Sequence, residues 1–355
     1  MNDSEVAATL LSYLADRFHC PHLTYATQPA RISGGLDAAI FGFALKDAPS
    51  ALQGPLILRL NRPDVGTERI TLEAIVHNWL AGQGYIIPDV RVAETDPALL
   101  GGRFTVMTRI AGKPLGHEIE RVLGTGTILT KIAGLARIPS IVRDVVDAWV
   151  DAQIKLQALD PAPLLAEVRA GGLDPALVTY EGQLARMAVA VRQYSLGGLQ
   201  PAIAWLDAHK PSALRASLCH GDFHPLNILG EQGKVTGVID WGNVVVAPAE
   251  MDVGSAIANI ANVPLDVPAV LRMPVQMVMA HILRRYRAAY ESRKPLDDAA
   301  VRYFQTFRCV AQLVPVLINR AKGGAGGGAF GSDRGIARLV RAIRATSGVV
   351  VTIKN

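Results

Sequence analysis

The sequence predicts an α+β fold in which a β-rich N-terminal part precedes a longer, mostly helical part. Between residues 25 and 106, apolar residues gather in short runs separated by turn-forming residues, as in strands joined by turns. Beyond residue 110, apolar residues recur at helical spacing over long stretches. Half of the 355 residues are hydrophobic and 19% are charged, which suits a chain with a sizeable buried core. We therefore expect an N-terminal lobe at 1–110 and a helical C-terminal lobe at 111–355.

The N-terminal lobe is expected to hold one antiparallel sheet and two helices. Apolar positions at helical spacing predict a first helix over residues 5–18, with Ser4 as its N-cap. A second helix is expected over 68–80. The strands of a five-stranded sheet are expected to begin near residue 25 and to cover 39–45, 55–60, 89–93 and 103–107.

The C-terminal lobe is expected to be helical apart from one segment. A strong amphipathic pattern predicts a helix over 141–159. Residues 219–241 interrupt the helical pattern with strands and loops, and the Gly-rich residues 321–332 are typical of a flexible loop. Further helices are expected around 180–195, 199–209, 252–262, 272–290, 297–319 and 335–345.

Composition narrows the class of protein. The cysteines Cys20, Cys219 and Cys309 lie far apart without a CxxC pair, so neither a disulfide framework nor a zinc knuckle is expected. The N-terminus is acidic and polar, unlike a secretory signal, and no run of 18 uncharged apolar residues occurs. We therefore expect a soluble, cytoplasmic protein without a membrane partner.

The charge of the chain is unevenly placed. From residue 251 to the end there are fifteen Lys and Arg against six Asp and Glu, whereas the net charge of the whole chain is +5. This excess fits either a solvated helical surface or a preference for neutral or anionic partners. The basic residues are scattered along helices without interleaved aromatic residues, so we expect no nucleic-acid partner.

The most informative motif is His220-Gly-Asp-Phe-His-Pro-Leu-Asn227, with Asp240 thirteen residues after Asn227. Phosphoryl transfer from a nucleotide requires a base for a hydroxyl proton and two oxygen ligands for magnesium. Asp222 is the candidate base, and Asn227 and Asp240 are the candidate Mg²⁺ ligands. The residues between Asn227 and Asp240 are typical of a short hairpin, which would return Asp240 to the neighbourhood of Asn227.

Other interpretations of this motif remain open at this point. Asp222 taken alone could cap a turn. His220 and His224 flank it in a His-x-Asp-x-His array that could suit a metallohydrolase, although no further His/Glu cluster supplies the remaining ligands. We expect His220 to brace the loop through its backbone and His224 to line the substrate side.

The motif, together with Ile239-Asp-Trp-Gly and Met251-Asp-Val-Gly, resembles the aminoglycoside phosphotransferase/choline kinase family, including macrolide kinases. The resemblance covers roughly residues 25–320 and implies a protein-kinase-like bilobal fold. It implies that Asp222 is the catalytic base, that Asn227 and Asp240 hold Mg²⁺, and that His220 is structural. It also implies that Asp252 is a buried aspartate supporting the catalytic loop.

In the N-terminal lobe the resemblance implies a nucleotide site. Gly34 and Gly35 stand where the family places a phosphate-covering loop. Glycine suits such a loop because it lets backbone N–H groups approach phosphate oxygens. Arg59 stands where protein kinases place a phosphate-binding lysine, and Glu73 is its expected ion-pair partner. The connector residues whose backbone would bind the nucleobase are Met107, Thr108 and Ile110.

The chain also departs from the kinase pattern. Gly221 replaces the Arg with which protein kinases read a phosphorylated activation segment, and no Ala-Pro-Glu signature follows Asp240, so a protein substrate is not expected. Asp37 would repel phosphates unless it points away from them. Arg59 is not equivalent to Lys and could be a surface residue; Lys46 is an alternative cation.

The sequence thus predicts a magnesium-dependent kinase that uses ATP or GTP and acts on a small hydroxylated molecule, as a monomer or homodimer. The basic C-terminal third favours a neutral or weakly charged acceptor, such as a macrolide, sugar or metabolite. Two alternatives remain: an aminoglycoside O-phosphotransferase, and a pseudokinase that binds nucleotide without turnover.

Overall fold

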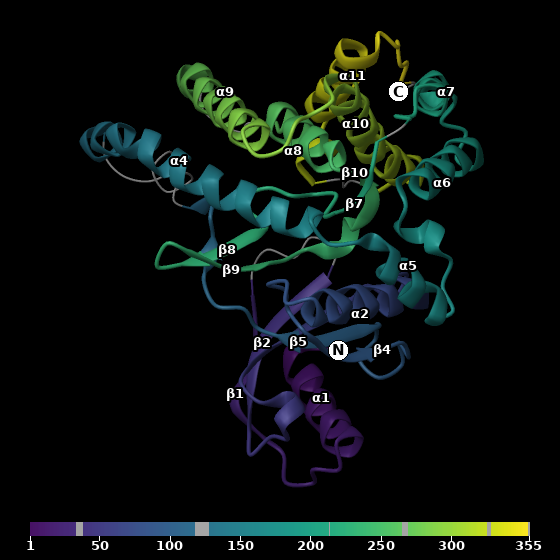
Figure 1. Cartoon of the computed structure of the whole chain (residues 1–355). Coiled ribbons are helices and arrows are strands. Elements are labelled where there is room, and N and C mark those ends of the chain that lie inside the picture. Colours follow the sequence, from purple (N-terminus) through teal and green to yellow (C-terminus); the bar gives the residue numbers. More distant parts are fainter. Residues whose placement is uncertain (33–37, 118–127, 213, 265–268, 325–327, 354–355) are drawn as a thin grey trace. The chain divides into compact units, whose positions relative to one another are not determined.

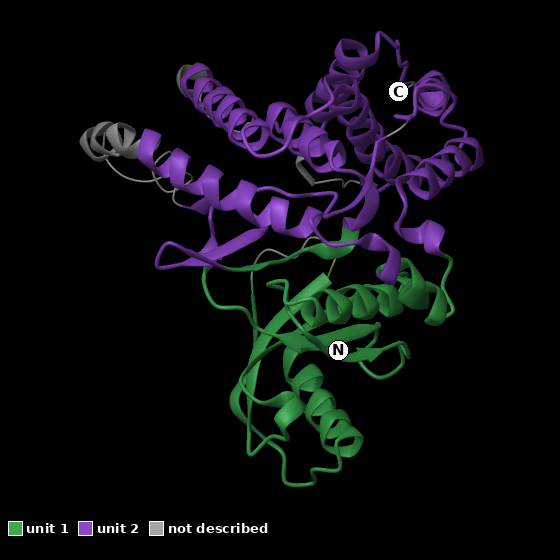
Figure 2. Cartoon of the chain, in the orientation of Figure 1, with its two compact units in different colours: residues 1–112, 164–174, 236–242 green, residues 113–163, 175–235, 243–355 purple. Residues whose placement is uncertain are grey.

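The computed structural model describes residues 1–32, 38–117, 128–212, 214–264, 269–324 and 328–353 (Figure 1). Gly34, Gly35 and Asp37 lie outside these residues. The chain forms two compact units (Figure 2). The first holds residues 1–112 with 164–174 and 236–242, and the second holds 113–163, 175–235 and 243–355. The expected lobes, 1–110 and 111–355, divide the chain by a single cut, whereas the first unit also contains two later segments.

The first unit is built on the expected antiparallel sheet of five strands, in the order β1-β2-β3-β5-β4. The helix α1 (Asp3–Arg17) precedes the sheet, the short 3-10 helix η1 (Ser50–Leu52) lies between β2 and β3, and α2 (Thr67–Gly82) follows β3. The strands are β1 (Thr24–Arg31), β2 (Ala38–Lys46), β3 (Pro55–Asn61), β4 (Val90–Glu94) and β5 (Phe104–Thr108).

The expected N-cap of the first helix is wrong by two residues. The cap is Asn2, whose side chain accepts a hydrogen bond from Glu5 N, while the Glu5 carboxylate accepts one from Asn2 N. This reciprocal pair is a capping box, and it satisfies two amide donors at the helix start. Ser4 lies inside the helix, where it has no capping role.

The two faces of the sheet have different roles because side chains alternate along a strand. One face packs Phe41, Phe43 and Leu58 with the α1 residues Leu10 and Leu14 in a buried apolar cluster. The other face carries Arg59, which lies opposite Ile40 in the register of β2 and β3. The sheet therefore presents a polar residue on the face that is not filled by α1.

The second unit is mostly helical, and the expected helices are all present. The predicted helix over 141–159 begins earlier, because α4 continues through Pro139; proline removes one backbone hydrogen bond of a helix but need not end it. The helices are α4 (Ile128–Gln157), α5 (Pro161–Ala170, which continues into the first unit), α6 (Tyr180–Gln193), α7 (Gln200–Ala208), α8 (Glu250–Asn262), α9 (Ala269–Glu291), α10 (Asp298–Ala321) and α11 (Asp333–Ser347). Single 3-10 turns occur at η2 (Pro175–Val178), η3 (Gly197–Leu199), η4 (Trp241–Asn243) and, within the Gly-rich stretch 321–332, η5 (Gly328–Gly331).

Close packing of α8 on α10 organises this unit. A methyl group at Gly254 of α8 would lie 2.8 Å from both the Phe304 Cβ and the Val301 carbonyl oxygen of α10. The two backbones can therefore approach only because residue 254 has no side chain. None of the helices in the described part of the chain is long and apolar enough to cross a membrane.

Short strands interrupt the helices between α7 and α8, as predicted. Strand β7 (Ala216–Cys219) pairs antiparallel with β10 (Val245–Pro248). Strands β6 (Lys113–Pro114), β8 (Ile228–Glu231) and β9 (Lys234–Val238) form a second small sheet in that order. The expected hairpin is thus present as β8 and β9, and the chain continues from β9 into segment 236–242 of the first unit.

The loop from β7 to β8 passes close to the backbone at Asn243. Gly221, in this loop, has φ +77°, and a methyl group placed on it would lie 2.1 Å from the Asn243 carbonyl oxygen. Gly233, in the turn between β8 and β9, has the same φ of +77° but nothing within 4 Å of such a methyl group. The two glycines share the backbone conformation, but only Gly221 has the close contact.

This pair of glycines gives a matched test. Gly233→Ala is expected to cost about 1–2 kcal/mol of unfolding free energy, from the left-handed backbone alone. Gly221→Ala is expected to cost clearly more, because the methyl group also forces the loop away from Asn243. Urea denaturation of the two variants measures both losses. Equal losses would show that the contact at Asn243 does not constrain the loop.

Candidate active site

The loop after β7 is held by a carboxylate buried beneath it. Asp252, in the first turn of α8, is fully buried and accepts hydrogen bonds from His220 N (3.0 Å) and Gly221 N (2.7 Å). Burial raises the pKa of Asp252 to about 7, and the two backbone donors oppose that rise. A charge buried here is tolerable because its oxygens are hydrogen-bonded. The expected support of the loop by Asp252 is thus visible as two backbone contacts.

His220 and Phe223 anchor the same loop from within. His220 is fully buried, and its Nδ1 accepts a hydrogen bond from Asp222 N at 3.3 Å. Its ring meets the buried Phe223 ring edge-on, with 5.3 Å between the centroids. This is a contact with the loop backbone, as expected of His220, and it fixes the backbone at Asp222.

Three side chains lie around Oδ1 of the Asp222 carboxylate. This oxygen accepts a hydrogen bond from Asn259 Nδ2 (2.5 Å) and forms an ion pair with Arg308 Nη2 (2.9 Å), and His224 Nε2 lies 3.6 Å away. Burial acts to raise the pKa of Asp222, but Arg308, His224, His220 and Asn259 together outweigh it and hold the pKa below its ordinary value. The carboxylate is therefore ionised at neutral pH.

Asn259 is itself held by two donors. Arg308 Nε donates to its Oδ1 at 2.9 Å, and Gln312 Nε2 donates to the same oxygen at 2.7 Å. Because the amide oxygen faces these donors, the amide nitrogen must face Asp222. Sequence reasoning missed all three residues. Asn259 had a usable signal, since it follows Asp252 by seven residues and shares its helix face, whereas Arg308 and Gln312 are brought here by the packing of α10.

Asn227 and Asp240 have the chemistry of magnesium ligands. The Asn227 amide nitrogen donates to the Asp222 carbonyl oxygen at 3.0 Å, so its oxygen remains for a ligand. Asp240 is exposed and has φ +64°, an unusual backbone conformation for a residue other than glycine. An amide oxygen and a carboxylate are the hard donors that Mg²⁺ prefers. Asn227 belongs to the second unit and Asp240 to the first, so their sharing of one ion stays a prediction.

The segment carrying Asp240 is fixed within the first unit. Thr236 Oγ1 donates to the Ala111 carbonyl oxygen at 2.6 Å, and Val238 N donates to the Ile86 carbonyl oxygen at 2.8 Å. The Trp241 ring meets Tyr85 edge-on at 5.6 Å between centroids. Asp240 therefore lies on a segment attached to the connector after β5.

The predicted cation and its partner are brought together. Arg59 Nη1 lies 2.8 Å from Glu73 Oε1 of α2, with both side chains mostly buried. Arg59 is thus not a free surface residue. Lys46 ends β2, six residues beyond the partner of Arg59, which places it about 20 Å along the strand.

Two of the connector amides from Thr108 to Ile110 are bound within the chain. Thr108 N donates to the Asp89 carbonyl oxygen and Arg109 N to that of Pro55. Met107 is buried in β5. Among the described residues, Ile110 N has no hydrogen-bond partner, so it is the connector donor open to a nucleobase.

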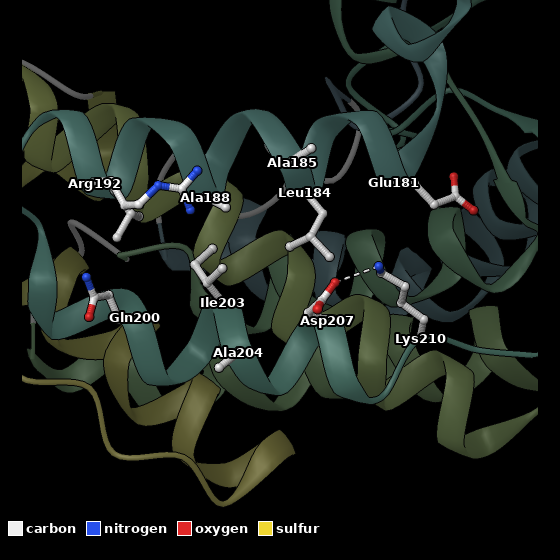
Figure 3. A pocket seen from close by; sticks show the side chains of 11 residues that line it. Glu181, Leu184, Ala185, Ala188, Arg192, Gln200, Ile203, Ala204, Asp207 and Lys210 are labelled. Atoms are coloured by element: carbon white, nitrogen blue, oxygen red, sulfur yellow. Dashed lines mark hydrogen bonds and ion pairs between the residues drawn. The ribbon is translucent and has the colours of Figure 1, made fainter.

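Each unit contains a cavity. The first unit has one of about 440 Å³ on the Arg59 face of the sheet, where Arg109 lies against Gly42 and the lining includes Ala44 and Pro55. The second unit has one of about 350 Å³ between α6 and α7, with a floor of Leu184, Ile203 and alanines (Figure 3). None of the predicted site residues lines this second cavity.

Solved structures share this fold. A putative aminoglycoside phosphotransferase from Ralstonia eutropha JMP134 is 16% identical, with a TM-score of 0.57 over 96% of this chain and 95% of that chain. A thermostable mutant of aminoglycoside phosphotransferase APH(4)-Ia, in ternary complex with AMP-PNP and hygromycin B, is 17% identical, with a TM-score of 0.59 over 96% and 100%. Macrolide 2'-phosphotransferase MphH from Brachybacterium faecium is 19% identical, with a TM-score of 0.51 over 95% and 97%.

A comparison with curated proteins finds no match. The family model of the phosphotransferase enzyme family, in contrast, matches residues 31–302, which is more than half of the chain. The matched region includes the loop of Asp222, the hairpin that leads to Asp240 and the Arg59–Glu73 pair. The protein is therefore a phosphotransferase with an α+β, protein-kinase-like fold, and it belongs to the phosphotransferase enzyme family.

Proposed function

We propose that the protein is a magnesium-dependent small-molecule kinase that transfers the γ-phosphoryl group of ATP or GTP to a hydroxyl of a neutral or weakly charged acceptor. The observation that carries this proposal is the ionised Asp222 carboxylate, presented by a loop whose backbone is bound by buried Asp252. The family membership supports the class of reaction.

In the proposed reaction Asp222 accepts a hydrogen bond from the acceptor hydroxyl and then its proton. The hydroxyl oxygen forms a bond to the γ-phosphorus while the bond from that phosphorus to the β,γ-bridging oxygen breaks, which releases a nucleoside diphosphate. Asn227 and Asp240 would hold Mg²⁺, which offsets the negative charge on the β- and γ-phosphates when it is bound. The proton on Asp222 passes to solvent after transfer.

The first unit supplies the nucleotide side of the proposal. Arg59, oriented by Glu73, neutralises phosphate charge, and Ile110 N donates to the nucleobase. The cavity on the Arg59 face offers room for the base beside Arg109. A pseudokinase is disfavoured because Asp222, Asn227 and Asp240 all keep the residue types that turnover requires.

The acceptor class follows from the charge of the C-terminal third. Arg308 is in contact with Asp222, so the Asp222 carboxylate offsets its charge. From residue 251 to the end, however, fifteen Lys and Arg stand against six Asp and Glu, and this excess of positive charge would repel a cationic acceptor. A polycationic aminoglycoside, whose reacting hydroxyl is flanked by amines, would meet this repulsion. A neutral or weakly charged acceptor, such as a macrolide, sugar or metabolite, would not.

Asp222→Ala tests the reaction. Loss of the base is expected to lower kcat by roughly 10²- to 10⁴-fold, while the nucleotide Kd stays within a factor of about two because no phosphate contact of Arg59 changes. Phosphate transfer and nucleotide titration measure the two quantities. Asp207→Ala removes an exposed carboxylate whose ion pair is with Lys210 and serves as the control. Retained turnover in the Asp222 variant would exclude the mechanism.

Arg59→Met tests the nucleotide side. Removing the guanidinium is expected to raise KM for the nucleotide by about 10- to 100-fold, because a charged hydrogen bond to phosphate is lost. Arg62→Met is the control: Arg62 lies three residues after Arg59, beyond the end of β3, and pairs with exposed Asp64, so the change should alter KM little. Steady-state kinetics with varied nucleotide make the comparison. Equal effects in both variants would assign Arg59 a structural role only.

A screen of nucleotide consumption tests the acceptor class. Neutral sugars, macrolides and hydroxylated metabolites are expected to give kcat/KM at least about tenfold above kanamycin-like polycations, given the excess of positive charge in the C-terminal third. The reverse order would establish the aminoglycoside alternative. Stabilisation by Mg-nucleotide without transfer to any acceptor would establish the pseudokinase alternative.

A further inference from the structure

We propose that Arg308 and Asn259 are positioning residues that anchor one oxygen of Asp222, Oδ1, and so present its other oxygen, Oδ2, to the acceptor hydroxyl. This inference rests on the proposed function, because it assigns the geometry of the same base.

The contacts of the carboxylate are one-sided. Asn259 Nδ2 at 2.5 Å, Arg308 Nη2 at 2.9 Å and His224 Nε2 at 3.6 Å all lie around Oδ1. Within the described residues, Oδ2 has no partner. The terminal torsion of an aspartate is broad, so an unheld carboxylate would exchange its two oxygens. Holding one oxygen with three groups removes that exchange and leaves a single oxygen for the substrate.

The anchor is rigid because its members hold each other. Arg308 donates through Nε to Asn259 and forms an ion pair through Nη2 with Asp222, so one planar guanidinium sets the spacing between the amide and the carboxylate. Gln312 donates to the same Asn259 oxygen at 2.7 Å. A lysine has no such planar fork and could not make both contacts in this geometry.

The anchor also shares its helices with the support of the loop. Asn259 lies seven residues after Asp252, two turns along α8, and Asp252 binds the loop backbone at His220 and Gly221. Arg308 reaches the site from α10, whose backbone meets α8 closely at Gly254. The backbone and the side chain of the catalytic loop are thus held from the same pair of helices.

Arg308→Ala is the direct test, made on the full chain with an acceptor found in the screen. We expect kcat to fall by roughly 10- to 100-fold, the effect of losing the ion pair with Asp222 and the charged hydrogen bond to Asn259, with KM for the nucleotide within about twofold because the nucleotide contacts lie elsewhere. Guanidinium ion, added well below denaturing concentrations, should restore part of the lost kcat in this variant. It should not raise the kcat of the wild-type enzyme. Arg308→Lys should stay impaired because it cannot replace the fork.

Two further variants complete the design. Asn259→Ala is expected to lower kcat, and the double variant with Arg308→Ala should lose less than the product of the single effects, because the two residues act as one anchor. Arg302→Ala removes an exposed arginine of the same helix and is the control for α10. Thermal unfolding of each variant checks that the second unit stays folded.

The outcomes separate this inference from the proposed function. If the wild-type enzyme transfers phosphate and Arg308→Ala has the same kcat, the inference is overturned and the proposed function stands. A fall in kcat without guanidinium rescue, accompanied by an equal loss of stability, also overturns it, because the pair is then only structural. Absence of transfer by the wild-type enzyme to every acceptor overturns the proposed function and, with it, the inference.

Discussion

The loop that carries Asp222 depends on one buried carboxylate and two backbone amides. Asp252 is fully buried, and its two oxygens accept from His220 N and Gly221 N. A carboxylate without these donors would be costly in this position, and the amides without the carboxylate would be buried and unpaired. The pair fixes the backbone of the loop, and the loop backbone then fixes Asp222 through His220 and Asn227 through the Asp222 carbonyl oxygen.

Charge is balanced locally in both units. In the first unit Glu73 orients Arg59 with a 2.8 Å ion pair, and in the second unit Arg308 balances Asp222. In each case the ionised residue proposed to act in the reaction is held by a partner of opposite charge, so each side chain has a fixed direction before any ligand binds. Phosphoryl transfer depends on side chains that are oriented before the substrate binds, since there is little covalent chemistry for the protein to perform.

The sequence predicted what local patterns determine and missed what packing determines. Short apolar runs separated by turn residues located the sheet, helical spacing located the helices, and the residue types between Asn227 and Asp240 predicted the hairpin seen as β8 and β9. The cap at Asn2 and the continuation of α4 through Pro139 depend on local hydrogen bonds that several nearby residues could have made. Arg308 could not be found in this way, because nothing in its neighbourhood in the sequence distinguishes it from the other arginines of the C-terminal third. It acts at Asp222 because α10 packs on α8, a contact between segments about fifty residues apart.

Asp252 and Asn259 lie on one helix, so the geometry around Asp222 is preserved when that helix is displaced. A helix moves as a rigid rod over short lengths, so a displacement of α8 carries along both the group that binds the loop backbone and the amide that binds its carboxylate. The loop backbone and the Asp222 carboxylate then move together with α8, so their relative positions are preserved. Arg308 and Gln312 come from the other helix, α10, so sliding between α8 and α10 would first change the ion pair of Arg308 with Asp222 and the hydrogen bonds of both residues to Asn259. Relative motion of the two helices would thus rotate the Asp222 carboxylate.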